Sequence, residues 1–164
     1  MRPEHSDFRE FVSARQGALR RTAYLLCGDW HQAQDLTQQT LAKLFVAWSR
    51  VRAVEAVDAY ARQVLVRTYI DESRKRRNHE LATADLPEHS AEGPEIETRL
   101  ALMAALKQLS PRQRAVVALR FWDDLSVEAT AEALGMKANT VKSDTARALA
   151  KLKGLLDSSL HETV

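Results

Sequence analysis

Polar and cationic side chains recur at helical spacing near the end of the chain. In the segment 138–153 they share one side of a predicted helix, which presents Asn139, Lys142, Ser143, Ala146 and Arg147. Polar side chains can read base edges, while Lys and Arg hold phosphates. This face is therefore typical of a helix that enters the major groove of DNA. The alternative is an ordinary helical hairpin whose polar face is only solvated.

A shorter predicted helix precedes this one and completes a helix-turn-helix. Ser126 is placed to cap its N-terminus, and Gly135 can adopt the left-handed conformation that ends it. Val127, Ala131 and Leu134 give it an apolar face at spacings of four and three. The second helix has its own apolar side, which comprises Val141, Thr145, Ala148, Leu149 and Leu152.

The overall composition favours helix nearly throughout the chain. Its 164 residues include only five Gly and four Pro, and 45% are hydrophobic and 28% charged, which is ordinary for a globular protein. A net charge of +2 and a pI near 8.8 are too mild to demonstrate nucleic-acid binding by themselves.

Several classes of function find no support in the sequence. Cys27 is the only cysteine, which excludes an intramolecular disulfide and a cysteine-based zinc cluster. No glycine-rich phosphate loop, nucleophile motif or metal-spaced His/Cys set occurs, so we expect neither an enzyme nor a bound metal or cofactor. The polar N-terminus lacks a secretory signal, and no apolar run approaches about 18 residues. We therefore expect a cytoplasmic protein without membrane insertion.

Two amphipathic helices are predicted in the first third of the chain. The first spans 8–27, and Asp29 can cap the second, which spans 30–51. The outer face of the second helix is polar but almost uncharged in its middle. It carries Gln32, Asp35, Gln38, Gln39 and Lys43. Such a face suits a contact surface, although a simply solvated face can have the same composition.

A third, strongly basic helix is predicted over 59–77, with Asp58 as its cap. Its buried stripe comprises Ala61, Val64, Leu65 and Thr68. Its remaining polar and cationic residues include Tyr60, Arg62, Gln63, Arg67, Arg74, Lys75, Arg76 and Arg77. The last four cations exceed what the helix dipole requires, so they predict a phosphate-binding patch.

An acidic segment divides the chain into two parts. Residues 79–97 include six acidic residues and no Lys or Arg, and Pro87, Gly93 and Pro94 interrupt any helix. We therefore predict an all-α protein of two small helical domains joined by a flexible acidic linker. The predicted parts are a first domain at 1–78, the linker at 79–97, a second domain at 98–155 and a C-terminal tail at 156–164.

The second domain contains a distinct helix start at 110–113. Its sequence, Ser-Pro-Arg-Gln, combines an N-cap, a Pro at the first helical position and a capping-box Gln. We expect Arg112 and Arg114 to be exposed at the start of this helix, where they could hold backbone phosphates. The residues expected to be buried over 112–122 are Ala115, Val116, Leu119 and Trp122, or their neighbours.

With these elements in order, the chain resembles the extracytoplasmic-function (ECF) group of the bacterial sigma-70 family over residues 8–77 and 98–153. AQDLTQQTLAKLFVAW is similar to the sigma-2 helix that docks on the clamp helices of the polymerase β′ subunit in that family. AYARQVLVRTYIDESRKRR is similar to the helix that reads and melts the promoter −10 element. The stretch 109–149 is similar to the sigma-4 domain, which reads the −35 element and packs against the β flap.

The resemblance implies roles for individual residues. Core RNA polymerase would be bound by Asp35, Gln38, Gln39 and Lys43. The −10 DNA would be bound by Tyr60, Arg62, Gln63, Arg67, Arg74, Lys75, Arg76 and Arg77, with the Tyr60 ring stacking on an unpaired base. The −35 DNA would be bound by Arg112, Arg114, Asn139, Thr140, Lys142, Ser143, Asp144 and Arg147.

Four positions depart from the pattern of the family. One is Lys137, which lies where Ser or Thr often caps the second helix. Arg67 stands where the family commonly has Asn, and Thr130 replaces an apolar Ile. Asp144 replaces a common Arg, and its carboxylate could accept a hydrogen bond from a cytosine amino group. These departures leave the promoter sequence open.

The function implied by the resemblance is that of an RNA polymerase sigma factor. It would bind core polymerase, recognise the −35 and −10 elements and melt the latter, without covalent chemistry. The acidic linker would thread toward the RNA path of polymerase, and an anti-sigma factor is an expected partner. The alternative is a helix-turn-helix regulator that binds duplex operator DNA without polymerase, which would leave the Gln-rich face and the basic helix unexplained.

Overall fold

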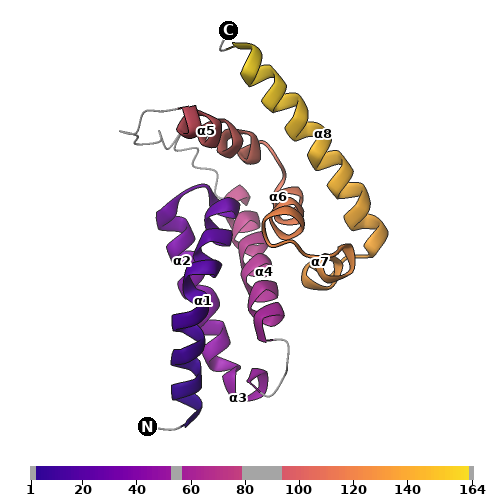
Figure 1. The fold of residues 1–164 in the computed structure, drawn as a ribbon. Helices are drawn as coiled ribbons and strands as arrows, with labels where there is room; N and C mark the ends of the chain where they lie inside the picture. Colours follow the sequence, from indigo (N-terminus) through magenta and orange to yellow (C-terminus); the bar gives the residue numbers. More distant parts are fainter. Residues whose placement is uncertain (1–2, 53–56, 79–93, 163–164) are drawn as a thin grey trace.

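The structure is a computed structural model that describes residues 3–52, 57–78 and 94–162, without the side chains at 3–4, 77–78, 94–95 and 159–162. Within these ranges all regular structure is helical, so the predicted all-α fold is confirmed (Figure 1). The helices are α1 (Pro3–Cys27), α2 (Trp30–Val46), α3 (Trp48–Val51), α4 (Val57–Asn78), α5 (Pro94–Lys107), α6 (Pro111–Val117), the π-helix η1 (Ala118–Trp122), α7 (Val127–Leu134) and α8 (Ala138–Glu162). Most of the predicted linker, at 79–93, and the Arg77 side chain lie outside the described residues. None of the described helices is long and apolar enough to cross a membrane.

Most helix ends confirm the capping residues predicted from the sequence. The Asp29 carboxylate accepts hydrogen bonds from two backbone N–H groups in the first turn of α2. The segment 110–113 forms a reciprocal capping box at the start of α6. The Ser126 hydroxyl caps α7, and Gly135 ends that helix with a φ of 66°. A positive φ is strained for residues with a Cβ, so the turn of the helix-turn-helix depends on this glycine.

Helices α1, α2 and α4 pack side by side into an N-terminal bundle, with the short α3 at one end (Figure 1). Leu26, Leu44 and Leu65 come from the three long helices and are fully buried. Burying a leucine side chain stabilises a fold by about 1.5–3 kcal/mol. Thr37 and Thr40 are also buried, and each hydroxyl donates to the carbonyl four residues earlier, so the core leaves neither unsatisfied.

The C-terminal bundle consists of α5, α6, η1, α7 and α8. One of its apolar clusters joins α5 to α8 and is built from Met103, Ala105, Leu106, Leu109, Ala148 and Leu152. A second cluster holds the helix-turn-helix together and is built from Val116, Ala131 and Val141. These residues confirm most of the apolar faces predicted for the second domain.

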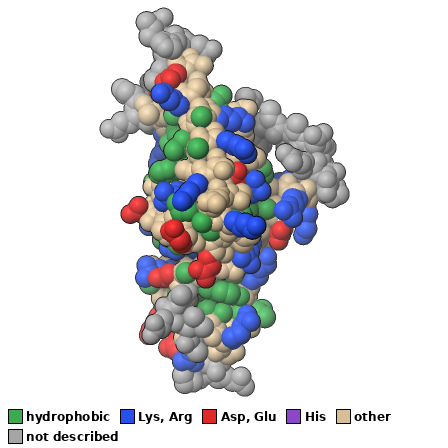
Figure 2. Space-filling view, turned by 90° about the vertical axis from the view of Figure 1, so that its right-hand side faces the viewer, with side chains coloured by type: hydrophobic (Ala, Val, Ile, Leu, Met, Phe, Trp, Pro, Cys, Tyr) green, Lys and Arg blue, Asp and Glu red, His purple; other side chains and the backbone are tan. Residues whose placement is uncertain are grey.

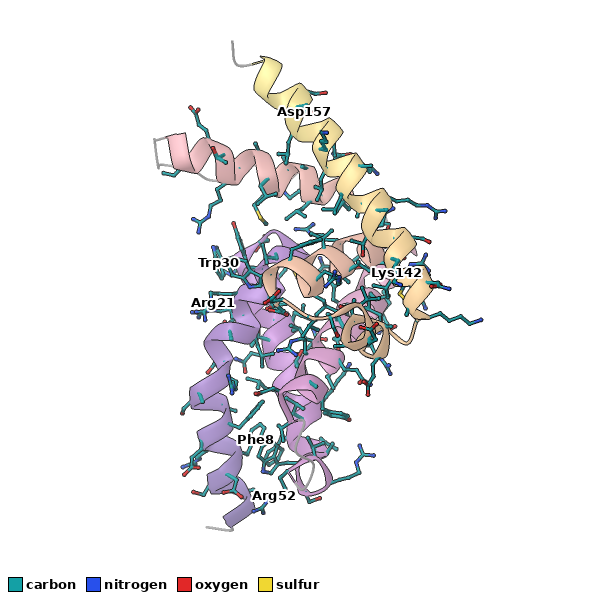
Figure 3. All side chains as sticks on the ribbon, turned by 45° about the vertical axis from the view of Figure 1, so that its right-hand side comes forward. Phe8, Arg21, Trp30, Arg52, Lys142 and Asp157 are labelled. Carbon is teal, nitrogen blue, oxygen red and sulfur yellow. The ribbon has the colours of Figure 1, made fainter. Side chains whose placement is uncertain are left out.

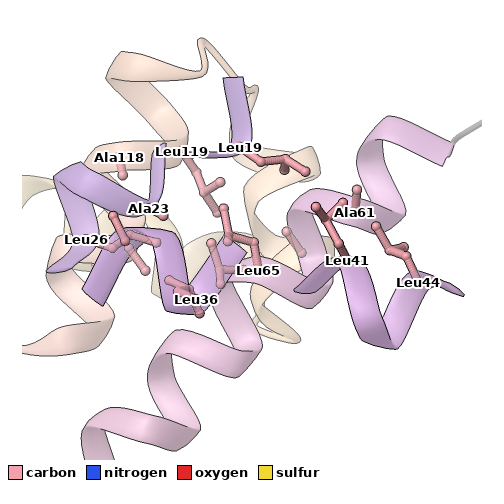
Figure 4. Close-up of a cluster of buried hydrophobic side chains, with 14 residues drawn as sticks. Leu19, Ala23, Leu26, Leu36, Leu41, Leu44, Ala61, Leu65, Ala118 and Leu119 are labelled. Carbon is pink, nitrogen blue, oxygen red and sulfur yellow. The ribbon is translucent and has the colours of Figure 1, made fainter. Parts of the chain in front are cut away.

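The two bundles also share one apolar core. Ala115, Ala118, Leu119 and Ala133 of the C-terminal bundle pack into the cluster that contains Leu65 and the other buried residues of the N-terminal bundle. Figure 4 shows Leu119 directed toward Leu65 within this cluster. The bundles therefore dock on one another in this structure.

Several helix boundaries differ from those predicted. A break after Val46 separates α2 from α3, and α4 begins one residue before Asp58, which lies in the first turn rather than at the cap. Helix α5 begins at Pro94, inside the predicted linker, because Pro is tolerated in the first turn of a helix. Helix α8 continues through the predicted tail as far as Glu162.

The helix predicted over 112–122 is interrupted by the π-helix η1. The Asp123 N–H donates to the Ala118 carbonyl at 3.0 Å, which closes a wider turn than that of an α-helix. Ala115, Val116 and Leu119 are buried as predicted, but the prediction for Trp122 is wrong, since it is 54% exposed. The wider turn rotates the residues that follow it out of α-helical register.

Candidate nucleic-acid interface

The first half of α8 presents the polar face predicted from the sequence. Asn139, Lys142, Ser143 and Arg147 are exposed and Thr140 is half-buried. Figure 2 shows Lys and Arg side chains spread over this side of the molecule, and Figure 3 marks Lys142 in the first turns of α8. The opposite side of the helix packs on α6 and α7. The polar face of α8 is therefore open to solvent, which is the first requirement of a helix that enters a DNA groove.

Asp144 does not share this face, so the expectation that it contacts DNA is wrong. It is 3% exposed, and its carboxylate lies 2.8 Å from Arg112 Nε on α6. Each residue of an α-helix is rotated by about 100° from the last, which places position 144 on the inward side of α8. Asp144 fixes α8 against α6, whereas the Arg112 side chain remains 55% exposed.

Arg114 is also not exposed, contrary to prediction. Only 5% of it is accessible, and its Nε donates to the Leu25 carbonyl of α1 at 2.6 Å. The docking of α1 covers the side of α6 on which Arg114 lies. Burial lowers the pKa of its guanidinium and raises the pKa of the neighbouring Cys27 thiol to about 11, which keeps the thiol neutral. Arg114 therefore joins the bundles and cannot reach DNA in this structure.

Arg62 on α4 faces the C-terminal bundle. Its Nε lies 3.4 Å from Asp123 Oδ2, and Thr22 Oγ1 of α1 donates to Asp123 Oδ1 at 3.0 Å. Burial raises the pKa of the Asp123 carboxyl, while the Thr22 hydrogen bond and the Arg62 charge act in the opposite direction. The sequence analysis missed Thr22 and Asp123, because they are 101 positions apart and no local pattern relates them.

Arg67 also contacts the C-terminal bundle. Its Nε donates to the Ala133 carbonyl at 3.1 Å and its Nη2 to the Glu132 carbonyl at 3.3 Å, both in the last turn of α7. With its amide oxygen turned toward this guanidinium, Gln63 accepts from Arg67 Nη1 at 3.1 Å. Gln63 and Arg67 therefore lie together as predicted. Arg67 remains exposed to solvent although two of its N–H groups donate to α7.

Tyr60 lies at the start of α4 and is half-buried against the shared core. Its hydroxyl accepts a hydrogen bond from Arg50 Nη2 at 3.4 Å. The ring is therefore positioned by packing on one side, and whether its remaining surface stacks on a base stays a prediction.

The cations at the end of α4 point in different directions. Arg74 lines a cleft of about 560 Å³ that separates α4 from the C-terminal bundle, where Arg67 and Arg112 also lie. Lys75 is 3.8 Å from Glu72, and Arg76 donates to the Gln32 side chain of α2. Consecutive residues on a helix face different sides, so these cations do not form the single patch that the sequence suggested. Those lining the cleft are nevertheless placed to attract an anion.

The polar face of α2 is exposed at Asp35, Gln38, Gln39 and Lys43. Lys43 Nζ donates to Thr68 Oγ1 at 2.9 Å, so the ammonium group of Lys43 lies against the neighbouring helix α4. Asp35 and Gln39 line a hollow of about 200 Å³ between α2 and α4. These four residues thus lie along one continuous solvent-facing surface, as a binding face for another protein requires.

An apolar groove between α5, η1 and α8 was not predicted. Leu102, Phe121, Trp122 and Leu149 are large, exposed and apolar, and they line a groove of about 270 Å³. Exposed apolar groups gathered in one place mark contact surfaces more often than isolated ones. Leu149 was predicted on the apolar side of its helix, but it lines this groove and is 41% exposed.

Comparison with known proteins assigns both bundles. Residues 11–79 match the family model of Sigma-70 region 2, and residues 99–152 match that of Sigma-70, region 4. The RNA polymerase sigma-E factor of Streptomyces coelicolor is 43% identical over 149 residues, which span 90% of this chain and 84% of that protein. The ECF RNA polymerase sigma factor SigM of Mycobacterium tuberculosis is 30% identical over 139 residues, 84% of this chain and 71% of that protein.

The arrangement of the helices has a counterpart among solved structures. The complex of the sigma factor RpoE with the anti-sigma factor NepR from Bartonella quintana contains a chain that matches with a TM-score of 0.70 and 26% sequence identity. The match covers 92% of this chain and 97% of that one, so it includes both bundles. The chain therefore belongs to the sigma-70 family, and within it to the ECF RNA polymerase sigma factors.

Proposed function

We propose that this sigma factor directs core RNA polymerase to promoters through three separate surfaces. Asp35, Gln38, Gln39 and Lys43 on α2 bind core polymerase. The α4 residues Tyr60, Arg62, Gln63, Arg67, Arg74, Lys75, Arg76 and Arg77 engage and help to melt the −10 element. Arg112 together with the α8 residues Asn139, Thr140, Lys142, Ser143 and Arg147 engages the −35 element. In this function the chain binds core polymerase and promoter DNA in the cytoplasm and helps to separate the DNA strands, with no covalent step.

The observation that carries this proposal is the exposed polar face of α8 on a capped helix-turn-helix. Side chains such as Asn139 and Ser143 can read base edges, and Lys142 and Arg147 can hold phosphates. Asp144 is excluded from this role by its burial. The basic helix α4 of the same chain offers a second DNA-binding surface, which a protein that contacts both the −35 and the −10 element requires.

Run-off transcription with purified core polymerase and a genomic promoter pool tests the proposal. We expect core polymerase to acquire new, specific start sites when the chain is added. Asp35→Lys together with Gln39→Ala should weaken core binding, whereas Ser13→Ala, at an exposed position on α1, should not. Retained binding to duplex DNA without any core binding would support a conventional helix-turn-helix regulator instead.

We also propose that an anti-sigma factor binds this chain. The RpoE chain that matches both bundles was solved with its anti-sigma factor NepR. The exposed apolar groove formed by Leu102, Phe121, Trp122 and Leu149 supports a protein partner. Co-purification of a protein with the native chain, lost in the Phe121→Ser/Trp122→Ser variant, is the expected result.

A further inference from the structure

Asp144 places a carboxylate inside the C-terminal bundle, where a single cation compensates its charge. The side chain is buried, and its Oδ2 accepts no aligned hydrogen bond within the described residues. Arg112 Nε lies 2.8 Å from this oxygen, and the described part of the chain shows no other ion pair of Asp144. A buried carboxylate is costly unless a cation stays beside it. Arg112 is therefore held at Asp144, unlike a surface arginine that rotates freely.

The carboxylate occupies only one edge of the Arg112 guanidinium. Arg112 Nη2 donates to Asp144 Oδ1 at 3.4 Å, so Asp144 lies along the edge formed by Nε and Nη2. A guanidinium is planar and carries its five N–H donors in a fixed fork. The edge formed by Nη1 and Nη2 therefore keeps donors for another anion, and their direction is fixed by the contact with Asp144. Because the Arg112 side chain is 55% exposed, a phosphate can reach this second edge.

The ion pair also joins two helices that border the predicted DNA surface. Arg112 lies in the first turn of α6, and α6 packs against α8. Asp144 directly follows Ser143, which belongs to the exposed polar face of α8. Helix-turn-helix proteins place one helix in the major groove, while a neighbouring helix contacts the DNA backbone beside that groove. The Arg112 guanidinium therefore lies where a backbone phosphate would pass if α8 entered a groove.

We propose that Asp144 is a positioning residue for promoter binding, which directs the free edge of Arg112 toward a backbone phosphate beside the groove that α8 enters. This inference deepens the proposed −35 role of Arg112 and rests on it. Asp144 itself does not touch DNA. Because a phosphate contact carries little base information, the pair sets the position of α8 in the groove and does not select the −35 sequence.

The direction of one effect separates positioning from simple charge repulsion. A carboxylate near DNA repels phosphate, so its removal should strengthen binding if Asp144 has no positioning role. If Asp144 directs Arg112, the variant Asp144→Asn, which keeps the shape of the side chain, should bind DNA more weakly. Asp157→Asn is the matched control, because it makes the same substitution at an exposed position near the far end of α8 (Figure 3).

Fluorescence anisotropy of the full chain with two labelled duplexes measures these effects. One duplex carries the −35 region of a promoter recovered by run-off transcription, and the other has a random sequence. We expect Arg112→Ala to weaken binding to both about tenfold, and to reduce the slope of log K against log salt concentration by about 1. Asp144→Asn should weaken binding to both about threefold, because a freed arginine side chain must be ordered when DNA binds. Asp157→Asn should leave both affinities nearly unchanged.

Two further variants distinguish positioning from a purely structural role of Asp144. In the Arg112→Ala background, Asp144→Asn should cause no further loss, because the side chain through which Asp144 acts is absent. Arg112→Lys keeps the buried carboxylate paired, but lysine lacks the second edge of the planar fork. It should therefore bind DNA nearly as weakly as Arg112→Ala. Thermal unfolding followed by circular dichroism verifies that each variant is folded at the temperature of the binding assay.

Three results would overturn the proposal. They are an Asp144→Asn variant that binds at least as tightly as the native chain, a loss of equal size with and without Arg112, and native affinity in Arg112→Lys. Run-off transcription with core polymerase separates this failure from failure of the proposed function. Promoter-specific transcripts from the native chain together with any of these results would reject the positioning role alone. An absence of transcripts would reject the −35 function on which it rests.

Discussion

The α4 and α8 helices both carry surfaces that we assign to DNA, yet their cations are used differently. Lys142 and Arg147 of α8 extend from an exposed face whose opposite side is buried. Arg62 and Arg67 of α4 bind a carboxylate and two carbonyls of the other bundle. A helix rich in cations therefore does not always present them all to DNA, because carboxylate and carbonyl oxygens of the protein can accept hydrogen bonds from the same arginine N–H groups.

The largest effect should come from removing the apolar group that seats one bundle on the other. Leu119 is fully buried in the shared core, so Leu119→Ala should lower the free energy of unfolding by about 2–5 kcal/mol. It should also lengthen the distance between spin labels placed on the two bundles, because the apolar contact between them is weakened. The cations of α4 would then be as free of protein contacts as those of α8. Denaturant unfolding measures the first effect. Leu149→Ala is the control, since Leu149 is 41% exposed, and an equal loss in both variants would contradict a shared core.

Next in size are substitutions in the two DNA-binding surfaces. Lys142→Ala should cost about 1–3 kcal/mol of binding at the −35 element if Lys142 reads a base. Arg74→Ala should instead weaken promoter opening at all sequences, because phosphate contacts carry little base information. Transcription from promoters with exchanged −35 sequences distinguishes the two variants, because only the Lys142→Ala defect should depend on the −35 sequence. A Lys142→Ala defect of the same size on every −35 sequence would make Lys142 a backbone contact, and loss of core binding in Arg74→Ala would contradict its role.

A smaller effect concerns the helix that covers α4. Thr130 of α7 is fully buried, and its hydroxyl has no hydrogen-bond partner. Replacing a buried unsatisfied hydroxyl by a methyl group of the same shape should raise the free energy of unfolding by about 1 kcal/mol in Thr130→Val. Thr40→Val is the matched control, because Thr40 donates to the Leu36 carbonyl at 2.8 Å and should lose stability instead. A loss in both variants would indicate that the Thr130 hydroxyl is satisfied in solution.

The smallest effect is a pH dependence of the contact between α4 and the C-terminal bundle. Arg15, Asp58 and Arg62 line the cavity that Asp123 faces, and burial raises the pKa of the Asp123 carboxyl above its ordinary value of 3.8. A group whose pKa is raised by folding binds protons more tightly in the folded state. The stability that it contributes is complete below pH 3.8 and is lost as the pH rises through the raised pKa.

The native chain should therefore gain stability relative to Asp123→Asn as the pH falls from neutrality, since the variant cannot titrate there. Parallel denaturant titrations of the two proteins between pH 7 and pH 4 measure this difference. A native chain that loses stability relative to the variant on acidification would mean that the attraction of Arg62 outweighs the burial of Asp123.

Much of the local structure followed from the sequence. Apolar spacing predicted the long helices and most of their buried residues, and Asp29, Ser126 and Gly135 were identified at helix ends from their chemistry alone. The exposed face of α8 was also predicted, because its polar residues and its buried ones alternate with the helical period. Each of these features is fixed by neighbours within a few positions.

The accessibility of individual cations could not be predicted in this way. Arg112 and Arg114 are two positions apart and were expected to behave alike, yet one is exposed and the other is buried against α1. Asp144 was assigned to a DNA-facing surface and proved to be the partner of Arg112. The partners lie 89 and 32 positions away, beyond the reach of any helical pattern.

The sequence by itself determined the helices, their caps and the polar face of α8, because these depend on interactions between residues close in the chain. Only the tertiary structure decided that the two bundles share a core and that α7 and Asp123 occupy the cations of α4. Those contacts join residues as distant as Thr22 and Asp123. Their formation depends on how whole helices pack, which local propensity does not specify.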